Sequence, residues 1–178
     1  VNTRTGWYSK TVNEATTGYA FEEVGKEDPT WGGKPITFPR IQGADVCGEI
    51  VGVGEGVSAS RIGERIITDG WLRDPNDPLN KNNAGYFGSE SDGGFADYTV
   101  ISSCNALSIN SNLTDAELAT FSCSYSTAEG MLNRANVTQK DTVLVPGASG
   151  GVGGALIQLS KRRKARVIAL SSEEKHKD

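Results

Sequence analysis

Apolar and polar positions alternate along the middle of the chain, which is the pattern of short β-strands. Over residues 41–54, and again over 63–68, β-branched side chains alternate with polar residues and glycines. Glycines inside such runs indicate bends or bulges at the corners of a barrel. Strand character returns over residues 93–101 and 106–109, after a polar segment at 69–92 that predicts a long loop.

The remainder of the chain changes to helical spacing. One helix is expected to begin at Thr114 and another to cover residues 126–135. A β-branched run at 142–145 then predicts a buried parallel strand. Apolar residues at positions i, i+3, i+4 and i+7 predict a helix after a glycine-rich turn: Val152, Ala155, Leu156 and Leu159. Residues 166–170 predict a second strand, which completes a strand–turn–helix–strand unit.

The glycine-rich turn has the composition of a dinucleotide-binding turn. It reads Ala148-x-Gly150-x-x-Gly153, with alanine in the first glycine position. A side chain at Gly150 or Gly153 would obstruct a pyrophosphate or the packing of helix on strand. The unpaired N–H groups at the start of the helix can bind an anion without a basic side chain. The predicted cofactor contacts in this turn are Ala148, Ser149, Gly150, Gly151, Val152 and Gly153; the alternative is a purely structural turn.

The composition excludes several classes of protein. The 178 residues carry a net charge of −4, so there is no electrostatic reason to expect a nucleic acid partner. No apolar run is long enough to span a membrane, and we expect no membrane association. Without a signal segment, and with three scattered cysteines, a cytoplasmic location is expected. The 22 glycines cluster around short β-rich segments and favour a turn-rich barrel.

Four groups of residues together resemble the medium-chain dehydrogenase/reductase superfamily. They are the glycine pattern of residues 43–57, Gly63-Glu64-Arg65, the run Gly93-Gly94-Phe95-Ala96-Asp97-Tyr98, and the turn at 150–153. The superfamily contains zinc alcohol dehydrogenases and zinc-free quinone oxidoreductases. The resemblance covers roughly residues 36–178.

The resemblance implies an α/β protein with a β-rich part. A GroES-like, partly open β-barrel is expected over residues 1–113, without its N-terminal strand. Linker helices and the first βαβ unit of an incomplete Rossmann domain, a doubly wound parallel sheet, are expected over residues 114–178. The active site would lie between the two domains. The chain is therefore predicted to be truncated relative to the complete enzyme and inactive alone.

Departures from the family pattern favour its zinc-free branch. Zinc members have Gly-His-Glu where this chain has Gly43-Ala44-Asp45, and the 69–92 loop has no cysteine for a structural zinc lobe. Cys123 stands where zinc members have a further thiolate ligand. One thiolate cannot hold zinc, so Cys123 is interpreted as a small buried hydrophobic residue. No metal ligand is predicted.

The same matching places two residues beside the nicotinamide ring, Thr127 and Val152; the alternatives are an ordinary helical threonine and a core valine. After the second strand, an NAD site normally has an acidic residue that binds the ribose hydroxyls. This chain has two hydroxyls and a cation there: Ser171, Ser172 and Lys175. They favour the 2′-phosphate of NADPH, while Glu173 keeps NADH as the alternative.

The predicted activity is hydride transfer to a quinone, an enone or a carbonyl substrate, without zinc. The cofactor supplies the hydride and the protein orients the reactants. Tyr8 and Tyr125 are the candidates for proton donation. The alternatives are a non-catalytic GroES-like interaction module and a zinc-dependent alcohol dehydrogenase relative.

Two further features concern the surface of the molecule. A sheet of only two parallel strands would leave an unpaired edge, which could support a homo-oligomer. The basic run Lys161-Arg162-Arg163-Lys164 ends the predicted helix, where cations interact favourably with the helix dipole. It is interpreted as a solvated helix end.

Overall fold

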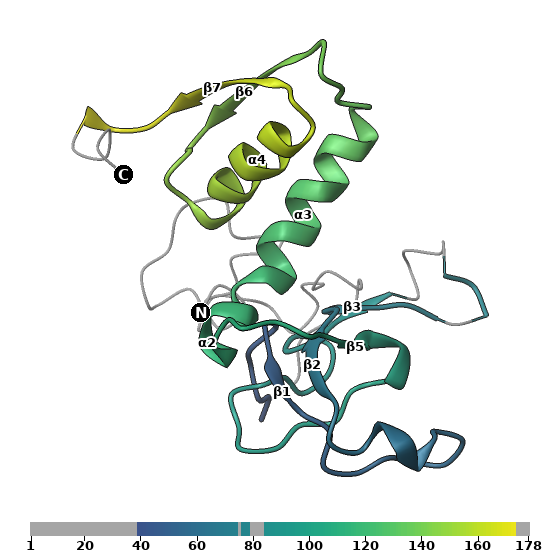
Figure 1. Cartoon of the computed structure of the whole chain (residues 1–178). Coiled ribbons are helices and arrows are strands. Elements are labelled where there is room, and N and C mark those ends of the chain that lie inside the picture. The colour runs from purple at the N-terminus through teal and green to yellow at the C-terminus, as the bar shows by residue number, and fades with distance from the viewer. Residues whose placement is uncertain (1–38, 75, 79–83, 174–178) are drawn as a thin grey trace. The chain divides into compact units, whose positions relative to one another are not determined.

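The computed structural model describes residues 39–74, 76–78 and 84–173 (Figure 1). The chain divides into two compact units, Val1–Asp115 and Ala116–Asp178. In the described part of the chain, none of the helices is both long and apolar enough to span a bilayer.

The first unit contains small antiparallel sheets. Its three-stranded sheet has the order β1-β2-β5, formed by β1 (Cys47–Glu49), β2 (Arg65–Thr68) and β5 (Ala106–Ser108). A separate hairpin pairs β3 (Trp71–Leu72) with β4 (Gly85–Tyr86). Two short 3-10 helices, η1 (Ala59–Arg61) and η3 (Ser103–Asn105), lie in the connections.

The central strand β2 carries the core of this sheet. Ile66 and Thr68 are buried, whereas the intervening side chains are half-buried, as the two-residue period of a strand requires. The Thr68 hydroxyl is satisfied on both sides: Oγ1 accepts a hydrogen bond from Val46 N at 3.2 Å and donates one to Ala44 O at 3.2 Å. A buried polar group of this kind is tolerated because it has its partners.

Several strands expected from the sequence differ in the structure. Of residues 41–54, only Cys47–Glu49 form a strand, and the described residues 93–101 form none. These two segments bond to each other instead through loop backbone, for example from Gly94 N to Gly43 O at 2.8 Å. The expected loop at 69–92 contains the β3–β4 hairpin. The barrel expected here is thus represented by small sheets joined by turns.

The second unit consists of helices and two parallel strands. Helix α2 (Asp115–Ala119) leads into it, and α3 (Phe121–Arg134) begins at Phe121 rather than at residue 126 as expected. Strand β6 (Thr142–Pro146), helix α4 (Gly151–Arg162) and strand β7 (Arg166–Leu170) follow. Because β6 and β7 pair in parallel, the predicted strand–turn–helix–strand unit is confirmed.

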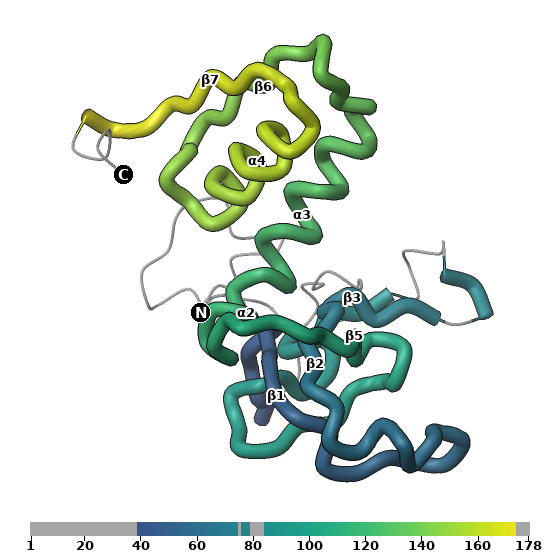
Figure 2. Tube along the Cα trace, viewed as in Figure 1, coloured from purple at the N-terminus to yellow at the C-terminus, as the bar shows by residue number. Residues whose placement is uncertain are grey.

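Helix α4 covers one face of the two-stranded sheet and leaves the other open. Val145 on β6 and Ala155 on α4 are each 1% exposed. On the opposite face, Leu144 is 58% exposed and Leu170 50%. The expectation that β6 would be buried is therefore wrong for alternate residues, because among the described elements only α4 packs on the sheet, and it covers one face. Figure 2 shows α3 running along α4.

Candidate functional site

The glycine turn between β6 and α4 packs very tightly at one position. A Cβ atom at Gly153 would collide with Gly147 O and lie 2.9 Å from Ala148 Cα. The expectation that Gly153 permits close packing of the helix is confirmed. A Cβ at Gly150 would lie 3.4 Å from its nearest neighbour, Gly147 O, which is an ordinary contact. Packing within the chain therefore does not require glycine at position 150, and its approach to a pyrophosphate stays a prediction.

The start of α4 is open at this turn. Gly147 has a φ of 73°, and its carbonyl accepts a hydrogen bond from Gly150 N at 3.1 Å, which closes the turn. Gly150 is the N-cap residue, and no side chain caps the helix there. The outer residues Ser149 and Gly151 are exposed. The first N–H groups of a helix have no partner within it, so these donors remain available to an anion.

The turn lies next to the end of β7. Ala148 N donates to Leu170 O at 3.0 Å, which places the residues after Leu170 beside the turn. Ser171 is half-buried and Ser172 is exposed; the Ser171 hydroxyl lies 3.3 Å from Ser172 O. The structure thus brings the predicted phosphate-binding turn and two of the predicted 2′-phosphate contacts together. The third, Lys175, lies outside the described residues.

Helix α3 passes the start of α4. A Cβ atom at Gly151 would lie 3.6 Å from Ser124 Cβ, so the two helices approach closely there. Thr127 lies one turn further along α3 and is exposed, and Val152 is half-buried. Both remain predicted nicotinamide contacts.

The structure gives Tyr125 a packing role that the sequence did not indicate. Its hydroxyl donates to Gln158 Oε1 at 2.9 Å, and its ring stacks on Phe121 with centroids 4.4 Å apart. The hydroxyl therefore links α3 to α4, and its role as a proton donor to substrate stays a prediction. Tyr8, the other candidate, lies outside the described residues.

A second link between α3 and α4 comes from the basic run. Arg163 donates to both carboxylate oxygens of Glu129, at 3.0 and 2.6 Å, and to Asn133 Oδ1 at 2.8 Å. The Arg163 guanidinium lowers the pKa of the Glu129 carboxyl. The interpretation of the whole run as solvated is thus wrong for Arg163, because sequence spacing does not show which helix lies opposite.

The family resemblance implies a zinc-binding histidine where this chain has Ala44, in the run Gly43-Ala44-Asp45. The Ala44 carbonyl accepts the Thr68 hydrogen bond, and its methyl group offers no metal ligand. In the described ranges, no group of three His, Cys, Asp or Glu side chains could hold a metal ion. Cys123, expected to be buried, is half-buried on α3. The described residues do not fit a zinc site.

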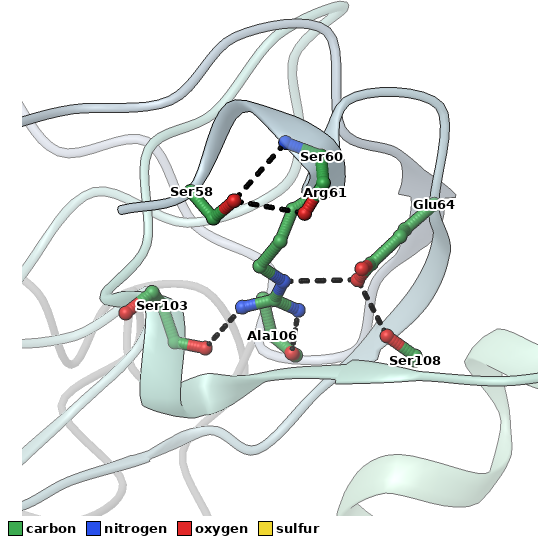
Figure 3. A network of polar contacts seen from close by, with 7 residues as sticks. All are labelled: Ser58, Ser60, Arg61, Glu64, Ser103, Ala106 and Ser108. Atoms are coloured by element: carbon green, nitrogen blue, oxygen red, sulfur yellow. Dashed lines mark hydrogen bonds and ion pairs between the residues drawn. The ribbon is translucent and has the colours of Figure 1, made fainter. Parts of the chain in front are cut away.

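The Gly63-Glu64-Arg65 motif has a structural role. Figure 3 shows Arg61, at the end of η1, donating to Glu64 at 2.9 Å, to Ser103 O at 2.9 Å and to Ala106 O at 2.7 Å. Ser108 on β5 donates to the same Glu64 carboxylate at 2.5 Å. The Ser108 hydroxyl and then Arg61 lower the pKa of Glu64. The network ties the η1 turn to β5.

Arg65, the last residue of this motif, holds the segment that leads out of the first unit. It donates to Ser111 O at 2.9 Å, to Leu113 O at 2.7 Å and to Asp115 Oδ1 at 2.8 Å. Cys47 Sγ also lies 3.4 Å from Asp115 Oδ1. Burial, followed by the Asp115 carboxylate, raises the pKa of the Cys47 thiol, so the thiolate is disfavoured.

We expect Arg65→Met to lower the midpoint of thermal unfolding, because one guanidinium holds three separate backbone and carboxylate groups. Arg65 lowers the pKa of Asp115 below its ordinary value of 3.8. The ion pair therefore stabilises the fold above pH 3.8 and is lost as the pH falls through the lowered value. The difference in midpoint between the native chain and Arg65→Met should shrink as the pH is lowered below 3.8.

The matched control is Arg73→Met, since Arg73 is exposed and has no hydrogen bond or ion pair in the described part of the chain. Circular dichroism melts of all three proteins at neutral and acidic pH measure the effect. An Arg65→Met midpoint equal to that of Arg73→Met would contradict a stabilising role for the Arg65 contacts.

A parallel strand–glycine turn–helix–strand unit is the opening unit of a doubly wound dinucleotide-binding sheet, and in this chain it follows small antiparallel sheets. The family model for the alcohol dehydrogenase GroES-like domain matches residues 15–111, more than half of the chain. The chain therefore belongs to the alcohol dehydrogenase GroES-like family of the medium-chain dehydrogenase/reductase superfamily, as its motifs predicted.

Curated relatives agree with this assignment. The chain is 32% identical over 147 residues to acryloyl-coenzyme A reductase of Metallosphaera sedula, which covers 78% of this chain and 44% of the relative. It is 28% identical over 146 residues to human quinone oxidoreductase, covering 82% of this chain and 38% of that protein. The chain thus spans less than half of the length of these relatives.

Solved structures give the same picture. A protein of Sinorhizobium meliloti 1021 assigned as an alcohol dehydrogenase is 48% identical, with a TM-score of 0.72, over 80% of this chain and 39% of that one. A cobalt- and zinc-bound thermostable alcohol dehydrogenase of Pyrobaculum aerophilum is 26% identical, with a TM-score of 0.68, over 78% and 43% of the two chains.

Proposed function

We propose that this chain contributes the GroES-like domain and the first nucleotide-binding unit of an NAD(P)H-dependent oxidoreductase. The observation that supports the proposal is the start of α4, which no side chain caps and where Gly153 packs closely against the turn. The substrate class we propose is a quinone, an enone or another carbonyl compound. Relatives named quinone oxidoreductase and acryloyl-coenzyme A reductase support it.

The chain's own residues would bind and orient the cofactor. N–H groups at the start of α4 would hold the diphosphate, and the hydroxyls of Ser171 and Ser172 would bind the 2′-phosphate of NADPH. Thr127 and Val152 would lie against the nicotinamide, whose chemistry is the delivery of a hydride. Orientation of this kind accounts for much of the catalysis when the acceptor delocalises its own charge.

We propose further that the reaction proceeds without zinc. The support is the donor set: Ala44 stands in the histidine position, and the described residues gather no three metal ligands. Elemental analysis of the longer enzyme that contains this chain tests the proposal. Stoichiometric zinc would favour the zinc-dependent alternative.

The nucleotide site is tested by calorimetric titration of the chain with NADPH and NADH. We expect NADPH to bind about tenfold more tightly, because the 2′-phosphate gains charge-assisted hydrogen bonds. Ser171→Asp should reverse this preference, since a carboxylate repels the phosphate and accepts from ribose hydroxyls. Ser103→Asp, which places the same charge on an exposed serine of the first unit, should change neither affinity.

Absence of binding for both nucleotides at millimolar concentration would favour the non-catalytic interaction module instead. Equal effects of Ser171→Asp and Ser103→Asp on nucleotide affinity would contradict the assignment of the 2′-phosphate contacts. Such a result would not affect the assignment of the diphosphate site.

A further inference from the structure

In the folded chain, the basic run at the end of α4 lies beside further basic residues that are distant in the sequence. Arg163 is occupied by Glu129 and Asn133, but its neighbours Lys161, Arg162 and Lys164 are exposed. Three exposed basic residues from other elements lie at the same end of the unit: Arg134, Lys140 and Arg166. We call these six residues the basic end.

Backbone and side-chain contacts bring the elements of the basic end together. Arg166 N donates to Asp141 O at 3.0 Å, so the starts of β6 and β7 lie side by side. The Arg163 side chain reaches Asn133 on the last turn of α3, which brings the ends of α3 and α4 together. Figure 1 shows these helix ends and strand starts at one end of the unit.

The six side chains of the basic end form no hydrogen bond or ion pair within the described ranges. Arg162 contributes through space to the lowered pKa of Glu129, which Arg163 already neutralises. The nearby carboxylate of Asp141 accepts from Thr138 N and from Thr138 Oγ1, at 2.7 and 2.8 Å. These hydrogen bonds lower the pKa of Asp141 and leave its carboxylate charged. The basic end therefore presents six exposed positive charges to solvent beside one ionised carboxylate.

The basic end is separate from the proposed cofactor site. It lies where β6 and β7 begin, whereas the glycine turn and Ser171 lie where these parallel strands end. A nucleotide held at the turn would leave these six side chains free. An anionic partner other than the nucleotide could therefore bind these six clustered side chains.

We infer that the basic end binds a carboxylate-rich segment of a partner protein. Residues 126–170 contain no Phe, Trp or Tyr, so the surface lacks the aromatic side chains on which single-stranded bases stack. A long duplex or a bilayer presents an anionic surface that extends far beyond one end of a small unit. A short acidic segment interacts mainly with charges within the Debye length of about 8–10 Å, and it therefore meets the basic end alone.

Fluorescence anisotropy with a labelled octaglutamate peptide tests the inference. We expect the peptide to bind at about 50 mM salt. Its affinity should fall about tenfold at about 200 mM salt, because exposed ion pairs are screened. The triple variant Lys161→Gln/Arg162→Gln/Lys164→Gln should weaken the binding of this peptide about tenfold. The triple variant should leave NADPH affinity unchanged, which separates this result from that of the cofactor site.

A matched pair of single variants controls for net charge. Arg162→Gln and Arg73→Gln each remove one charge from an exposed arginine, but only Arg162 belongs to the basic end. Equal effects of the two variants, or no octaglutamate binding at low salt, would overturn the inference. Tighter binding of a duplex DNA of equal charge, or of phosphatidylserine vesicles, would overturn it in favour of that class of partner.

Discussion

Replacing Gly153 with alanine is expected to weaken NADPH binding by more than about tenfold and to destabilise the second unit by about 2 kcal/mol. The new Cβ would collide with Gly147 O and lie 2.9 Å from Ala148 Cα and 3.0 Å from Ala148 O. These are backbone atoms, so no side-chain rotation can relieve the contact. The helix start must move away from the turn, and the N–H groups that face the diphosphate move with it.

Gly154 provides the matched control one residue further along α4. A Cβ there would meet nothing within 4 Å, and alanine is a better helix former than glycine by about 1 kcal/mol. Gly154→Ala should therefore stabilise the chain slightly and leave NADPH affinity unchanged. Calorimetric titration and chemical unfolding of both variants measure the two effects. Similar behaviour of the two variants would show that the close packing at Gly153 does not shape the site.

The second large effect is expected at Gly93, in the first unit. A Cβ there would collide with Gly43 O and lie 2.6 Å from Gly88 Cα and 2.8 Å from Gln42 O. Three separate backbone segments meet at this point, so Gly93→Ala should destabilise the unit by about 3 kcal/mol. Since Gly43 immediately precedes Ala44, the backbone at Ala44 should shift as well.

Gly52→Ala is the control for this change. It also adds one methyl group to a glycine of the first unit, but its Cβ would meet nothing within 4 Å. Its free energy of unfolding should stay within about 0.5 kcal/mol of that of the native chain. Urea unfolding followed by circular dichroism compares the two variants. A Gly93→Ala protein as stable as Gly52→Ala would contradict the three-segment packing.

The parts that the sequence predicted well are local. The β-branched run at 142–145, the glycine turn and the apolar spacing from Val152 to Leu159 lie within one short stretch, and each agrees with the others. The family assignment likewise depends on runs of neighbouring residues, such as Gly93-Gly94-Phe95, and the match over residues 15–111 confirms it.

The parts that the sequence missed depend on segments far apart in the chain. Residues 93–101 have strand-like composition, but only residues 93–95 bond to the segment near Gly43, and they do so as loop backbone without forming a strand. The contact of the Tyr125 hydroxyl with Gln158 was not expected, because nothing nearby in sequence shows that Gln158 lies opposite it. Arg163 could be read as solvated for the same reason, because its partner Glu129 is on another helix.

The amino-acid sequence by itself determined the family, the order of the elements and the position of the glycine turn. These features depend on the periodicity of apolar residues and on the residues that turns require, which both concern residues close in the chain. Only the tertiary structure decided that Gly153, and not Gly150, is held against the turn by the chain's own atoms. It also decided that six basic residues from separate elements share one end of the second unit. The physical reason is that steric and electrostatic interactions depend on distance in space, which the chain sets only once it has folded.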